Sequence, residues 1–296
     1  MMRGRWRHHY PMSRLASWRV GGPAREFFEP ADLAALSDFC RHDERAAKTL
    51  FVGHGSNLLV RDGGIDGVVA RIPPGVSEMR LQEGGVYVEA GVGCPKLARF
   101  AAAAGFADAA FLVGVPGTVG GALNMNAGCH GDEIWRHVTR VLVLEKGGSV
   151  ERSADDFDIG YRHVRAKNGK APIFAAAWLH FAPPTSATAA RARVQAMLQA
   201  RKQTQPIGAA SCGSVFCNPP GQAAGFLIES CGLKGHAVGG AVVSAKHANF
   251  IINTGPATAA DIEQLILLTQ QVVADKTGIL LQPEVSIVGQ EEKYGG

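Results

Sequence analysis

Two glycine-rich segments of the chain could hold a phosphate-bearing ligand against the backbone. The first, GHGSN at residues 53–57, directly follows an expected strand at residues 49–52, and the second, residues 114–121, has four glycines among eight residues. Loops of this kind expose successive backbone N–H groups, which form a concave site for a pyrophosphate. Structural turns would explain one such loop, but two loops far apart in the sequence fit a long ligand held between subdomains. FAD is the obvious candidate.

Other nucleotide and metal motifs are absent from the sequence. Leu58 stands where the last glycine of G-x-G-x-x-G would be, which disfavours a Rossmann dinucleotide site, and no G-x-x-x-x-G-K-[ST] segment exists. The six cysteines form no C-x-x-C pair and no zinc-like spacing, so we expect no metal site. We interpret them as reduced thiols of a cytoplasmic protein.

The composition predicts a globular protein of more than one domain. Of the 296 residues, 46% are hydrophobic and only 19% are charged, which excludes disorder and a coiled coil. The formal net charge of +4 is mild, so a nucleic-acid partner is not expected. The basic segment at residues 1–22 has no apolar core typical of a signal peptide, and no segment reads as a membrane span.

Alternating helices and strands must position the two loops. Short apolar runs between turn residues predict strands at residues 49–52, 68–72, 86–90, 138–144, 174–181 and 285–288. Apolar residues at helical spacing predict helices after Asp32, at residues 96–104 and 189–203, and after Thr258. Asp261 completes a capping pair with Thr258, and Gly278 ends that last helix. A linker at residues 183–186 places a domain boundary near residue 185.

A series of short motifs makes a specific resemblance. In chain order they are RVGG at 19–22, GHGSNLLVRD at 53–62, GVPGTVGG at 114–121, MNAG at 125–128, GSVFCNP at 213–219, GLKG at 232–235, SAKHANFIIN at 244–253 and PEV at 283–285. They cover nearly the whole chain. The sequence resembles the UDP-N-acetylenolpyruvoylglucosamine reductase (UDP-N-acetylmuramate dehydrogenase) family, and its length is similar to that of the compact subclass.

The resemblance implies an α+β fold in two parts. An N-terminal extension at residues 1–21 would precede an FAD-binding domain of the vanillyl-alcohol oxidase/p-cresol methylhydroxylase type at residues 22–185. That domain would have two α+β subdomains, about residues 22–75 and 76–185. A smaller α+β domain at residues 186–296 would bind the substrate.

The resemblance also implies an oxidoreductase of peptidoglycan precursor synthesis, and so of cell wall biogenesis, cell shape and cell division. NADPH would pass hydride to non-covalently bound FAD, which would reduce the enolpyruvyl ether of UDP-N-acetylglucosamine to UDP-N-acetylmuramate. The partners are then small molecules, with no nucleic acid or membrane. We expect a cytoplasmic monomer.

Three residues match the family's catalytic positions. Arg162 would bind the substrate carboxylate, since its planar fork suits an anion that develops during hydride addition. Ser214 would protonate the α-carbon, and Glu284 would accept a hydrogen bond from the enol or relay a proton to Ser214. Without the resemblance, each would be read as an ordinary surface arginine, turn serine or strand-edge glutamate.

The remaining matched positions divide into two binding sets. The residues expected to bind FAD are Arg19, Gly53, His54, Gly55, Ser56, Asn57, Leu58, Pro116, Gly117, Thr118, Gly120, Gly121, Asn126, Ala127 and Gly128. Those expected to bind the substrate or NADPH are Tyr161, Asn218, Lys234, Lys246, His247 and Asn249.

The chain departs from the family's pattern at Cys217, where a lysine is usual, at Val164, where a small hydroxyl residue is frequent, and at Cys129-His130, where Ala-Tyr is usual.

An FAD-dependent oxidase of an alcohol or sugar, or a non-catalytic flavin-binding protein, remains the alternative function. Covalent flavin attachment through His54 or Cys129 is a further alternative.

Overall fold

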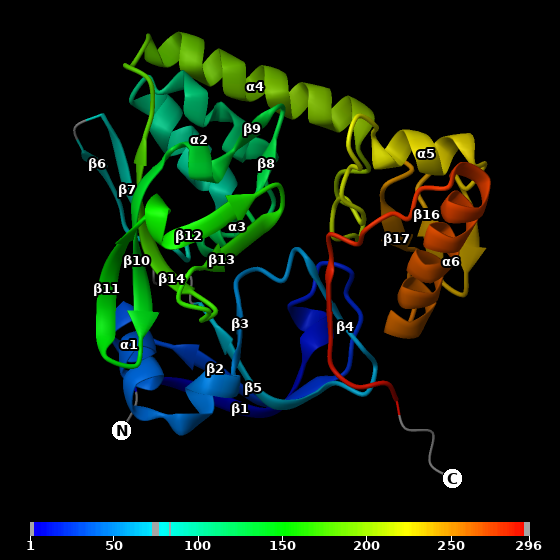
Figure 1. Cartoon of the computed structure of the whole chain (residues 1–296), viewed down its shortest axis with the longest axis horizontal. Coiled ribbons are helices and arrows are strands. Elements are labelled where there is room, and N and C mark those ends of the chain that lie inside the picture. The colour runs from blue at the N-terminus through cyan, green and yellow to red at the C-terminus, as the bar shows by residue number, and fades with distance from the viewer. Residues whose placement is uncertain (1–2, 73–76, 83, 293–296) are drawn as a thin grey trace. The chain divides into compact units, whose positions relative to one another are not determined.

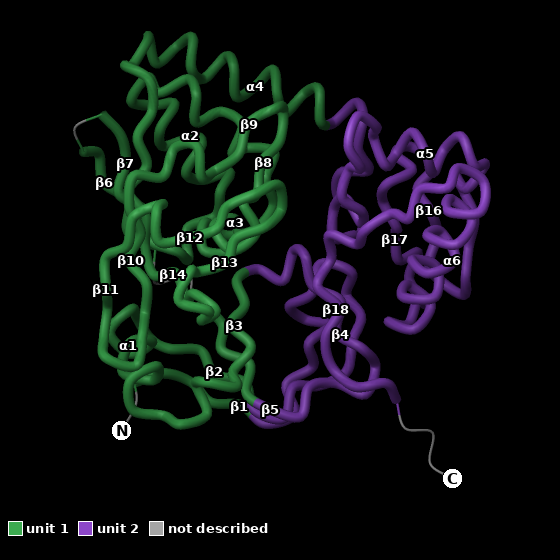
Figure 2. Tube along the Cα trace, viewed as in Figure 1, with its two compact units in different colours: residues 1–7, 27–53, 68–201 green, residues 8–26, 54–67, 202–296 purple. Residues whose placement is uncertain are grey.

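The protein divides into two compact units (Figures 1 and 2). The structure is a computed structural model that describes residues 3–72, 77–82 and 84–292. Unit 1 comprises Met1–Arg7, Phe27–Gly53 and Val68–Arg201. Unit 2 comprises His8–Glu26, His54–Gly67 and Lys202–Gly296. Each is described here by itself.

A five-stranded antiparallel sheet forms the centre of unit 1. Its strand order is β11 (Gly148–Ser153), β10 (Val138–Glu145), β14 (Ile173–His180), β7 (Gly85–Glu89) and β6 (Met79–Gln82). Successive residues of a strand face opposite sides of a sheet, and β10 follows this rule. Val141 and Val143 belong to one hydrophobic core, whereas Leu142 and Leu144 contact another. The sheet is therefore covered on both faces.

The larger of these two cores packs helices against the sheet. Around it lie α2 (Cys94–Ala103), α3 (Val119–Asn124), the 3-10 helix η3 (Ala107–Gly114) and α4 (Ala187–Thr204). Pro95 starts α2 because proline suits the first turn of a helix. Only Ala190 and Val194 of α4 are buried, and both contribute to the core of unit 1.

The second core of unit 1 joins the other face of the sheet to α1 (Leu33–His42). Phe28, Leu36 and Phe39 are its fully buried large side chains, and Trp6 stacks on Phe28 with ring centroids 4.5 Å apart. Asp32 caps α1 by accepting a hydrogen bond from the Ala35 N–H at 2.8 Å, as its sequence position predicts.

A four-stranded sheet contributes residues to both units. Its strand order is β1 (Gly4–Pro11), β2 (Pro23–Pro30), β5 (Ile65–Arg71) and β3 (Leu50–Val52). Short hairpins complete unit 1: β8 (Gly128–Cys129) with β9 (Asp132–Glu133), and β12 (Phe157–Gly160) with β13 (His163–Ala166). Further 3-10 helices are η1 (Met12–Arg14), η2 (Glu44–Lys48), η4 (Ile134–Arg136) and η5 (Ala154–Asp156).

Unit 2 has its own hydrophobic core, built against α6 (Ala259–Thr277). Packed with it are α5 (Ala224–Ser230) and a three-stranded sheet of β15 (Ala237–Val238), β16 (Ala241–Val243) and β17 (Ile251–Asn253). A parallel pair joins β4 (Leu58–Val60) to β18 (Ser286–Val288). The capping box of Thr258 and Asp261 and the left-handed Gly278 bound α6 as predicted.

The compact units differ from the domains expected from the sequence. Residues 8–26 and 54–67 cluster with the C-terminal third, and unit 1 extends to Arg201 rather than ending near residue 185. The physical reason for the second difference is α4, whose buried face packs on the core of unit 1. The expected N-terminal extension includes β1, a paired strand.

Within the described residues no helix is long and apolar enough to cross a membrane, and no group of three or more His, Cys, Asp or Glu side chains is arranged to hold a metal ion. All six cysteines are free thiols.

Candidate active site

The two glycine-rich loops meet in unit 1. Gly53 follows β3 directly, and a Cβ atom placed on it would overlap Oγ1 of Thr118. Thr118 is 2% exposed and caps α3, its Oγ1 accepting a hydrogen bond from the Gly121 N–H at 3.3 Å. Gly120 is equally confined, because its Cβ would lie 2.9 Å from the Cβ of Ala90. Glycine suits both positions because the side chains of Thr118 and Ala90 pack directly against the backbone there.

These residues fit a pyrophosphate-bearing cofactor such as FAD. The loops present backbone rather than side chains, and Gly117 (φ +102°) turns the second loop into the N-terminal end of α3. Pro116 is exposed and Gly117 is half-buried, whereas Val115 and Gly120 are buried, so only part of the loop is accessible to a ligand. The N–H groups of Val119, Gly120 and Gly121 donate within the protein, so phosphate oxygens would be bound by other N–H groups of the two loops.

The two glycine-rich loops at residues 53–57 and 114–121 together form what we call the glycine cradle. A Gly53→Ala substitution tests whether it binds FAD. We expect FAD to bind about 10- to 100-fold more weakly, because the added methyl group would overlap Thr118 and displace the loops that hold the cofactor. Titration of the apoprotein with FAD, followed by flavin fluorescence, measures the change. Gly147→Ala is the matched control, since nothing lies within 4 Å of a Cβ on Gly147. Equal FAD affinity in the two variants would contradict the cradle.

The rest of the first loop belongs to unit 2. Gly55 adopts φ +64°, and its carbonyl accepts a hydrogen bond from the Ser17 N–H at 3.1 Å. The side chain of Asn57 donates from Nδ2 to the Glu284 carbonyl oxygen at 2.9 Å. Leu58 begins β4, with its side chain 6% exposed. Asn57 therefore connects a predicted cofactor loop to a predicted catalytic segment.

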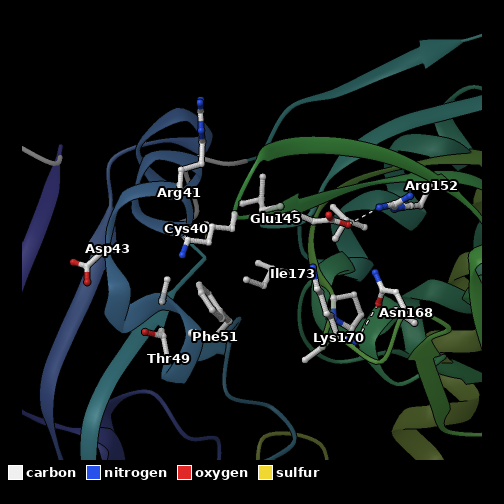
Figure 3. Close-up of a pocket in the computed structure, with 18 of the residues that line it drawn as sticks. Cys40, Arg41, Asp43, Thr49, Phe51, Glu145, Arg152, Asn168, Lys170 and Ile173 are labelled. Atoms are coloured by element: carbon white, nitrogen blue, oxygen red, sulfur yellow. Dashed lines mark hydrogen bonds and ion pairs between the residues drawn. The ribbon is translucent and has the colours of Figure 1, made fainter.

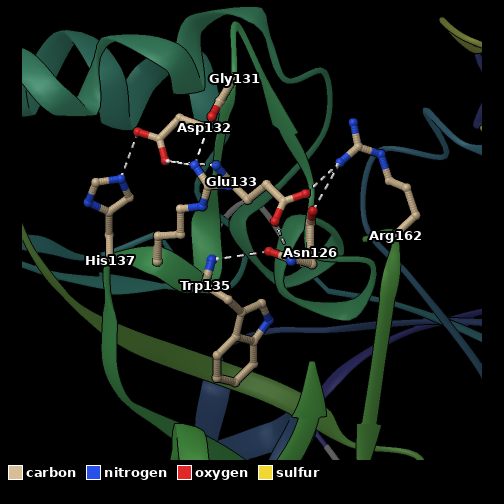
Figure 4. Close-up of polar contacts among 8 residues, drawn as sticks. Asn126, Gly131, Asp132, Glu133, Trp135, His137 and Arg162 are labelled. Carbon is tan, nitrogen blue, oxygen red and sulfur yellow. Dashed lines mark hydrogen bonds and ion pairs between the residues drawn. The ribbon is translucent and has the colours of Figure 1, made fainter. Parts of the chain in front are cut away.

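Unit 1 brings Arg162 to the loop at residues 126–128 (Figure 4). The guanidinium donates from Nη1 to the Asn126 carbonyl oxygen at 3.1 Å and from Nη2 to the Gly128 carbonyl oxygen at 3.0 Å. Nη1 also lies 3.9 Å from Oε1 of Glu133. The Arg162 side chain is 16% exposed, so its charge is held in a largely enclosed setting that strengthens its interaction with an anion.

Arg162 occupies an unfavourable backbone position. β12 and β13 pair Gly160 with His163, which leaves Tyr161 and Arg162 as the two central residues of the turn. Arg162 has φ +54°, a left-handed conformation that turns usually assign to glycine or asparagine. Such strain at a non-glycine residue is typical of functional sites. The exposed Tyr161 ring lies under the guanidinium, 4.8 Å from its carbon.

In unit 2 a backbone ladder places Ser214 and Glu284 on neighbouring segments. The Glu284 N–H donates to the Val215 carbonyl oxygen at 2.8 Å, and Phe216 forms a β-bridge with Pro283. The Val215 N–H in turn donates to the Asn249 carbonyl oxygen at 2.9 Å. Val215, the residue after Ser214, is thus hydrogen-bonded through both its N–H and its carbonyl group. Ser214 itself is half-buried.

The charge of Glu284 affects a buried thiol close to Ser214 in the sequence. Burial raises the pKa of the Cys212 thiol well above its usual value, and the nearby negative charge of Glu284 raises it further. Cys212 precedes Ser214 by two residues, so the charge of Glu284 acts on the segment that carries the serine. The thiol stays protonated and neutral at physiological pH, and it does not compete with Ser214 as a charged group.

Two of the predicted substrate ligands, Asn249 and Asn218, also have contacts within the protein. Asn249 is 4% exposed, and its amide accepts from the Phe216 N–H at 2.9 Å and donates to the Phe216 carbonyl oxygen at 2.8 Å. Asn218 accepts from the Ala224 N–H at 2.9 Å, next to the start of α5. Asn249 supports the serine segment through this pair of bonds.

The predicted cations of unit 2 are exposed or already paired. Lys246 donates from Nζ to the Lys202 carbonyl oxygen at 2.6 Å, and Lys234 pairs with Glu229 at 2.6 Å. Burial lowers the pKa of His247, and the positive charge of Lys234 lowers it further. His247 is therefore neutral at pH 7 and could offer a diphosphate a hydrogen bond but no charge.

The lowered pKa of His247 should depend on the positive charge of Lys234. A Lys234→Gln variant should raise the pKa of His247, because removing a nearby positive charge favours the protonated imidazole. An NMR titration of the imidazole carbon-bound protons measures it. Lys246→Gln is the control, since the charge of Lys246 does not contribute to the shift. A His247 pKa that stays unchanged in Lys234→Gln would contradict the influence of Lys234.

The predicted site residues thus divide between the units. In unit 1 lie Gly53, Pro116, Gly117, Thr118, Gly120, Gly121, Asn126, Ala127, Gly128, Tyr161 and Arg162. In unit 2 lie Arg19, His54, Gly55, Ser56, Asn57, Leu58, Ser214, Asn218, Lys234, Lys246, His247, Asn249 and Glu284. Of these, Arg19 is exposed at φ +60° and His54 is exposed.

Glu133, next to Arg162, was not predicted. The only sequence signal for it is an acidic pair, Asp132-Glu133, directly after the glycine-dense stretch.

A cavity of unit 1 lies away from these residues (Figure 3). Its volume is about 1030 Å³, and it is lined by the C-terminal end of α1, η2, β3, the β10–β11 hairpin and residues 166–173. Within it Arg152 pairs with Glu145 at 2.8 Å. None of the predicted catalytic or binding residues lines this cavity.

Comparison with known proteins gives the chain's relationships. A UDP-N-acetylenolpyruvoylglucosamine reductase from Methylococcus capsulatus is 49% identical over 295 residues, covering 98% of this chain and 95% of the relative. Another reductase of that name, from Alkalilimnicola ehrlichii, is 49% identical over 290 residues, covering 98% of this chain and 96% of the relative. The chain belongs to the UDP-N-acetylenolpyruvoylglucosamine reductase family.

Both parts of the chain match reductase-family components. A family model described as an FAD binding domain matches residues 25–154, and one described as UDP-N-acetylenolpyruvoylglucosamine reductase, C-terminal domain, matches residues 205–288. The crystal structure of the reductase from Thermus caldophilus is 31% identical with a TM-score of 0.80, covering 97% of this chain and 99% of that one. The predicted α+β fold, a vanillyl-alcohol oxidase-type FAD-binding domain with a C-terminal α+β domain, is confirmed.

Cys217 is a departure from the reductase family's usual lysine. Its N–H donates to the Gln282 carbonyl oxygen at 2.9 Å, so the residue extends the ladder that carries Ser214 and Glu284. The Cys217 backbone therefore takes part in the ladder through a bond that does not involve its side chain.

Proposed function

We infer that the chain catalyses the NADPH-dependent reduction of UDP-N-acetylglucosamine enolpyruvate to UDP-N-acetylmuramate, a step of peptidoglycan precursor synthesis. The observation that carries this conclusion is 49% identity to a reductase over 98% of the chain. FAD, when bound in the glycine cradle, supplies hydride transfer from NADPH to the substrate. The chain's own residues must bind the substrate and manage the charge that this transfer creates.

Arg162 is proposed to bind the carboxylate of the enolpyruvyl group. Hydride addition at the β-carbon builds negative charge on the α-carbon and the attached carboxylate. A fixed guanidinium stabilises that charge without reorganising during the reaction, and one well-placed donor contributes roughly 2.7–4 kcal/mol. Support comes from its two carbonyl contacts, which hold the side chain in one place.

Ser214 is proposed to donate the proton that the α-carbon then accepts. A serine hydroxyl is protonated at every working pH, and the basic enolate-like intermediate can take its proton. Glu284 is proposed to relay a replacement proton to Ser214. The backbone ladder between their segments supports this pairing. The mechanism requires Arg162 and Ser214 to act on one substrate molecule.

The proposal also includes the setting of the reaction. We place the enzyme in the cytoplasm as a monomer of 31.2 kDa, with FAD bound non-covalently. Six free thiols suit a reducing compartment. Burial raises the pKa of Cys129 to about 11, which disfavours the thiolate needed for a covalent bond to flavin.

An anaerobic two-step experiment tests the function. Addition of NADPH to the yellow protein should bleach the flavin, and subsequent addition of the enolpyruvyl nucleotide should restore the colour and yield UDP-N-acetylmuramate. Flavin that is recoloured by oxygen but not by the nucleotide would favour an oxidase. Protein that is colourless and does not bind added FAD would overturn the proposal.

A further inference from the structure

Glu133 has no role in the reaction as proposed so far, yet it lies at the centre of the contacts around Arg162 (Figure 4). It belongs to β9 (Asp132–Glu133) and its side chain is 22% exposed. We propose that Glu133 is a positioning residue, which holds Arg162 at the substrate carboxylate by fixing Asn126. This inference rests on the role proposed above for Arg162.

The side chain of Asn126 is bonded to three segments. Its Nδ2 donates to Oε2 of Glu133 at 3.0 Å and to the Gly160 carbonyl oxygen at 3.0 Å. Its Oδ1 accepts from the Trp135 N–H at 3.3 Å. Asn126 is 3% exposed, so a lost partner would leave a buried N–H group unsatisfied.

The backbone of Asn126 depends on these side-chain bonds. Asn126 has φ +45°, a left-handed conformation that asparagine adopts more readily than most residues, and its side-chain bonds fix that conformation here. Its carbonyl oxygen is one of the two acceptors of the Arg162 guanidinium. Glu133 therefore acts on the arginine through the direction of a carbonyl group: if Asn126 relaxes, that acceptor moves.

A second connection reaches Arg162 through its own turn. Asn126 binds the carbonyl oxygen of Gly160, the residue that ends β12 two positions before Arg162. Arg162 itself has φ +54°. Asn126 and Arg162, both in left-handed conformations, thus stabilise each other, and Glu133 accepts a hydrogen bond from the amide that links them.

The direct ion pair contributes less to this arrangement. The distance of 3.9 Å between Glu133 Oε1 and Arg162 Nη1 exceeds hydrogen-bond length, whereas the contact with Asn126 is 3.0 Å. The inference therefore predicts that a neutral acceptor of the same length can replace Glu133, and that a shorter carboxylate cannot.

Three variants separate these possibilities. Glu133→Gln keeps an oxygen acceptor at the same reach, Glu133→Asp keeps the charge on a side chain one methylene shorter, and Glu133→Ala removes both. Glu151→Gln is the matched control, because Glu151 lies on β11, is 52% exposed and pairs with Arg140. If Glu133→Ala does not fold, the contrast of Gln with Asp still decides the question.

Two measurements are made on the FAD-loaded protein. Calorimetry of the oxidised protein gives the affinity for the enolpyruvyl nucleotide, and anaerobic stopped flow gives the rates of bleaching and recolouring. We expect Glu133→Ala and Glu133→Asp to lose about tenfold in affinity and about 10- to 100-fold in recolouring, since a small misplacement of a binding group has this effect. Glu133→Gln and Glu151→Gln should stay within about threefold, and NADPH bleaching should be unchanged in all four.

The outcomes that overturn the inference are distinct from those that overturn the proposed function. Unimpaired recolouring in Glu133→Ala and Glu133→Asp, or equal losses in Gln and Ala, would refute the positioning role. So would a further loss when Glu133→Ala is added to Arg162→Ala, because a positioning residue has no effect once its target is gone. If the unsubstituted protein is bleached but never recoloured by the nucleotide, the proposed function fails instead.

Discussion

A Ser214→Ala variant is expected to be bleached by NADPH at the rate of the unsubstituted protein but to be recoloured by the enolpyruvyl nucleotide roughly 10²–10⁴-fold more slowly. The first step needs no proton at the substrate carbon, whereas the second needs one at the α-carbon. Anaerobic stopped-flow absorbance of the flavin resolves the two steps within one experiment. The loss should appear in the recolouring rate at saturating nucleotide, and much less in the nucleotide concentration that gives half of that rate.

The matched control for this variant is Ser211→Ala. Ser211 lies three positions before Ser214 in the same segment, also half-buried. It should recolour within about twofold of the unsubstituted rate, because it is not expected to contact the reacting atoms. Recolouring of Ser214→Ala at the rate of Ser211→Ala would eliminate Ser214 as the proton donor.

The Ser214→Ala variant should fold like the unsubstituted protein. The segment is held by backbone bonds of Val215 with Asn249 and Glu284, and by the Asn249 amide on Phe216. None of these bonds uses the Ser214 hydroxyl. Removing one oxygen from a half-buried side chain therefore changes the chemistry of the site while the ladder stays intact, and the melting temperature should confirm this.

Local sequence patterns were sufficient to predict the elements that stabilise themselves locally. The capping box and apolar stripe of α6 lie within one stretch of sequence, and the structure confirms both. β1 was missed because its sequence, GRWRHHYP, has neither an apolar run nor alternation, and none of its residues is fully buried. Its place at the edge of a sheet comes from pairing with β2, which sequence patterns do not show.

The candidate site shows the same limit. The glycine loops could be found in the sequence because close backbone approach demands glycine, and the contact of Gly53 with Thr118 fits this interpretation. The resemblance assigned Asn249 to the substrate, and sequence could not show that Asn249 is buried and that its amide bonds the Phe216 backbone. Glu133 could not be predicted, since its partners Asn126 and Arg162 come together only in three dimensions.

Substitution of Arg162 should have the second large effect. Arg162→Ala is expected to slow recolouring by the nucleotide roughly 10²–10³-fold, as the loss of one preorganised donor at a developing anion does. Arg162→Lys should recover part of this loss, because an ammonium group supplies charge but cannot reproduce two directed contacts. Bleaching by NADPH should be unaffected in both. A fully active lysine variant would contradict the need for a planar, fixed cation.

The backbone of the same residue predicts an effect on stability that separates the fold from the chemistry. Arg162 has φ +54°, so alanine at this position keeps the strain while glycine relieves it. Arg162→Gly and Arg162→Ala both lose the guanidinium and its bonds to the Asn126 and Gly128 carbonyl oxygens. Arg162→Gly should therefore be about 1 kcal/mol more stable than Arg162→Ala in urea unfolding, while both recolour equally slowly. If the two variants were equally stable, the left-handed conformation at residue 162 would be contradicted. If Arg162→Gly were more stable than Arg162→Ala but just as slow to recolour, the strained turn would be shown to be retained for the arginine side chain.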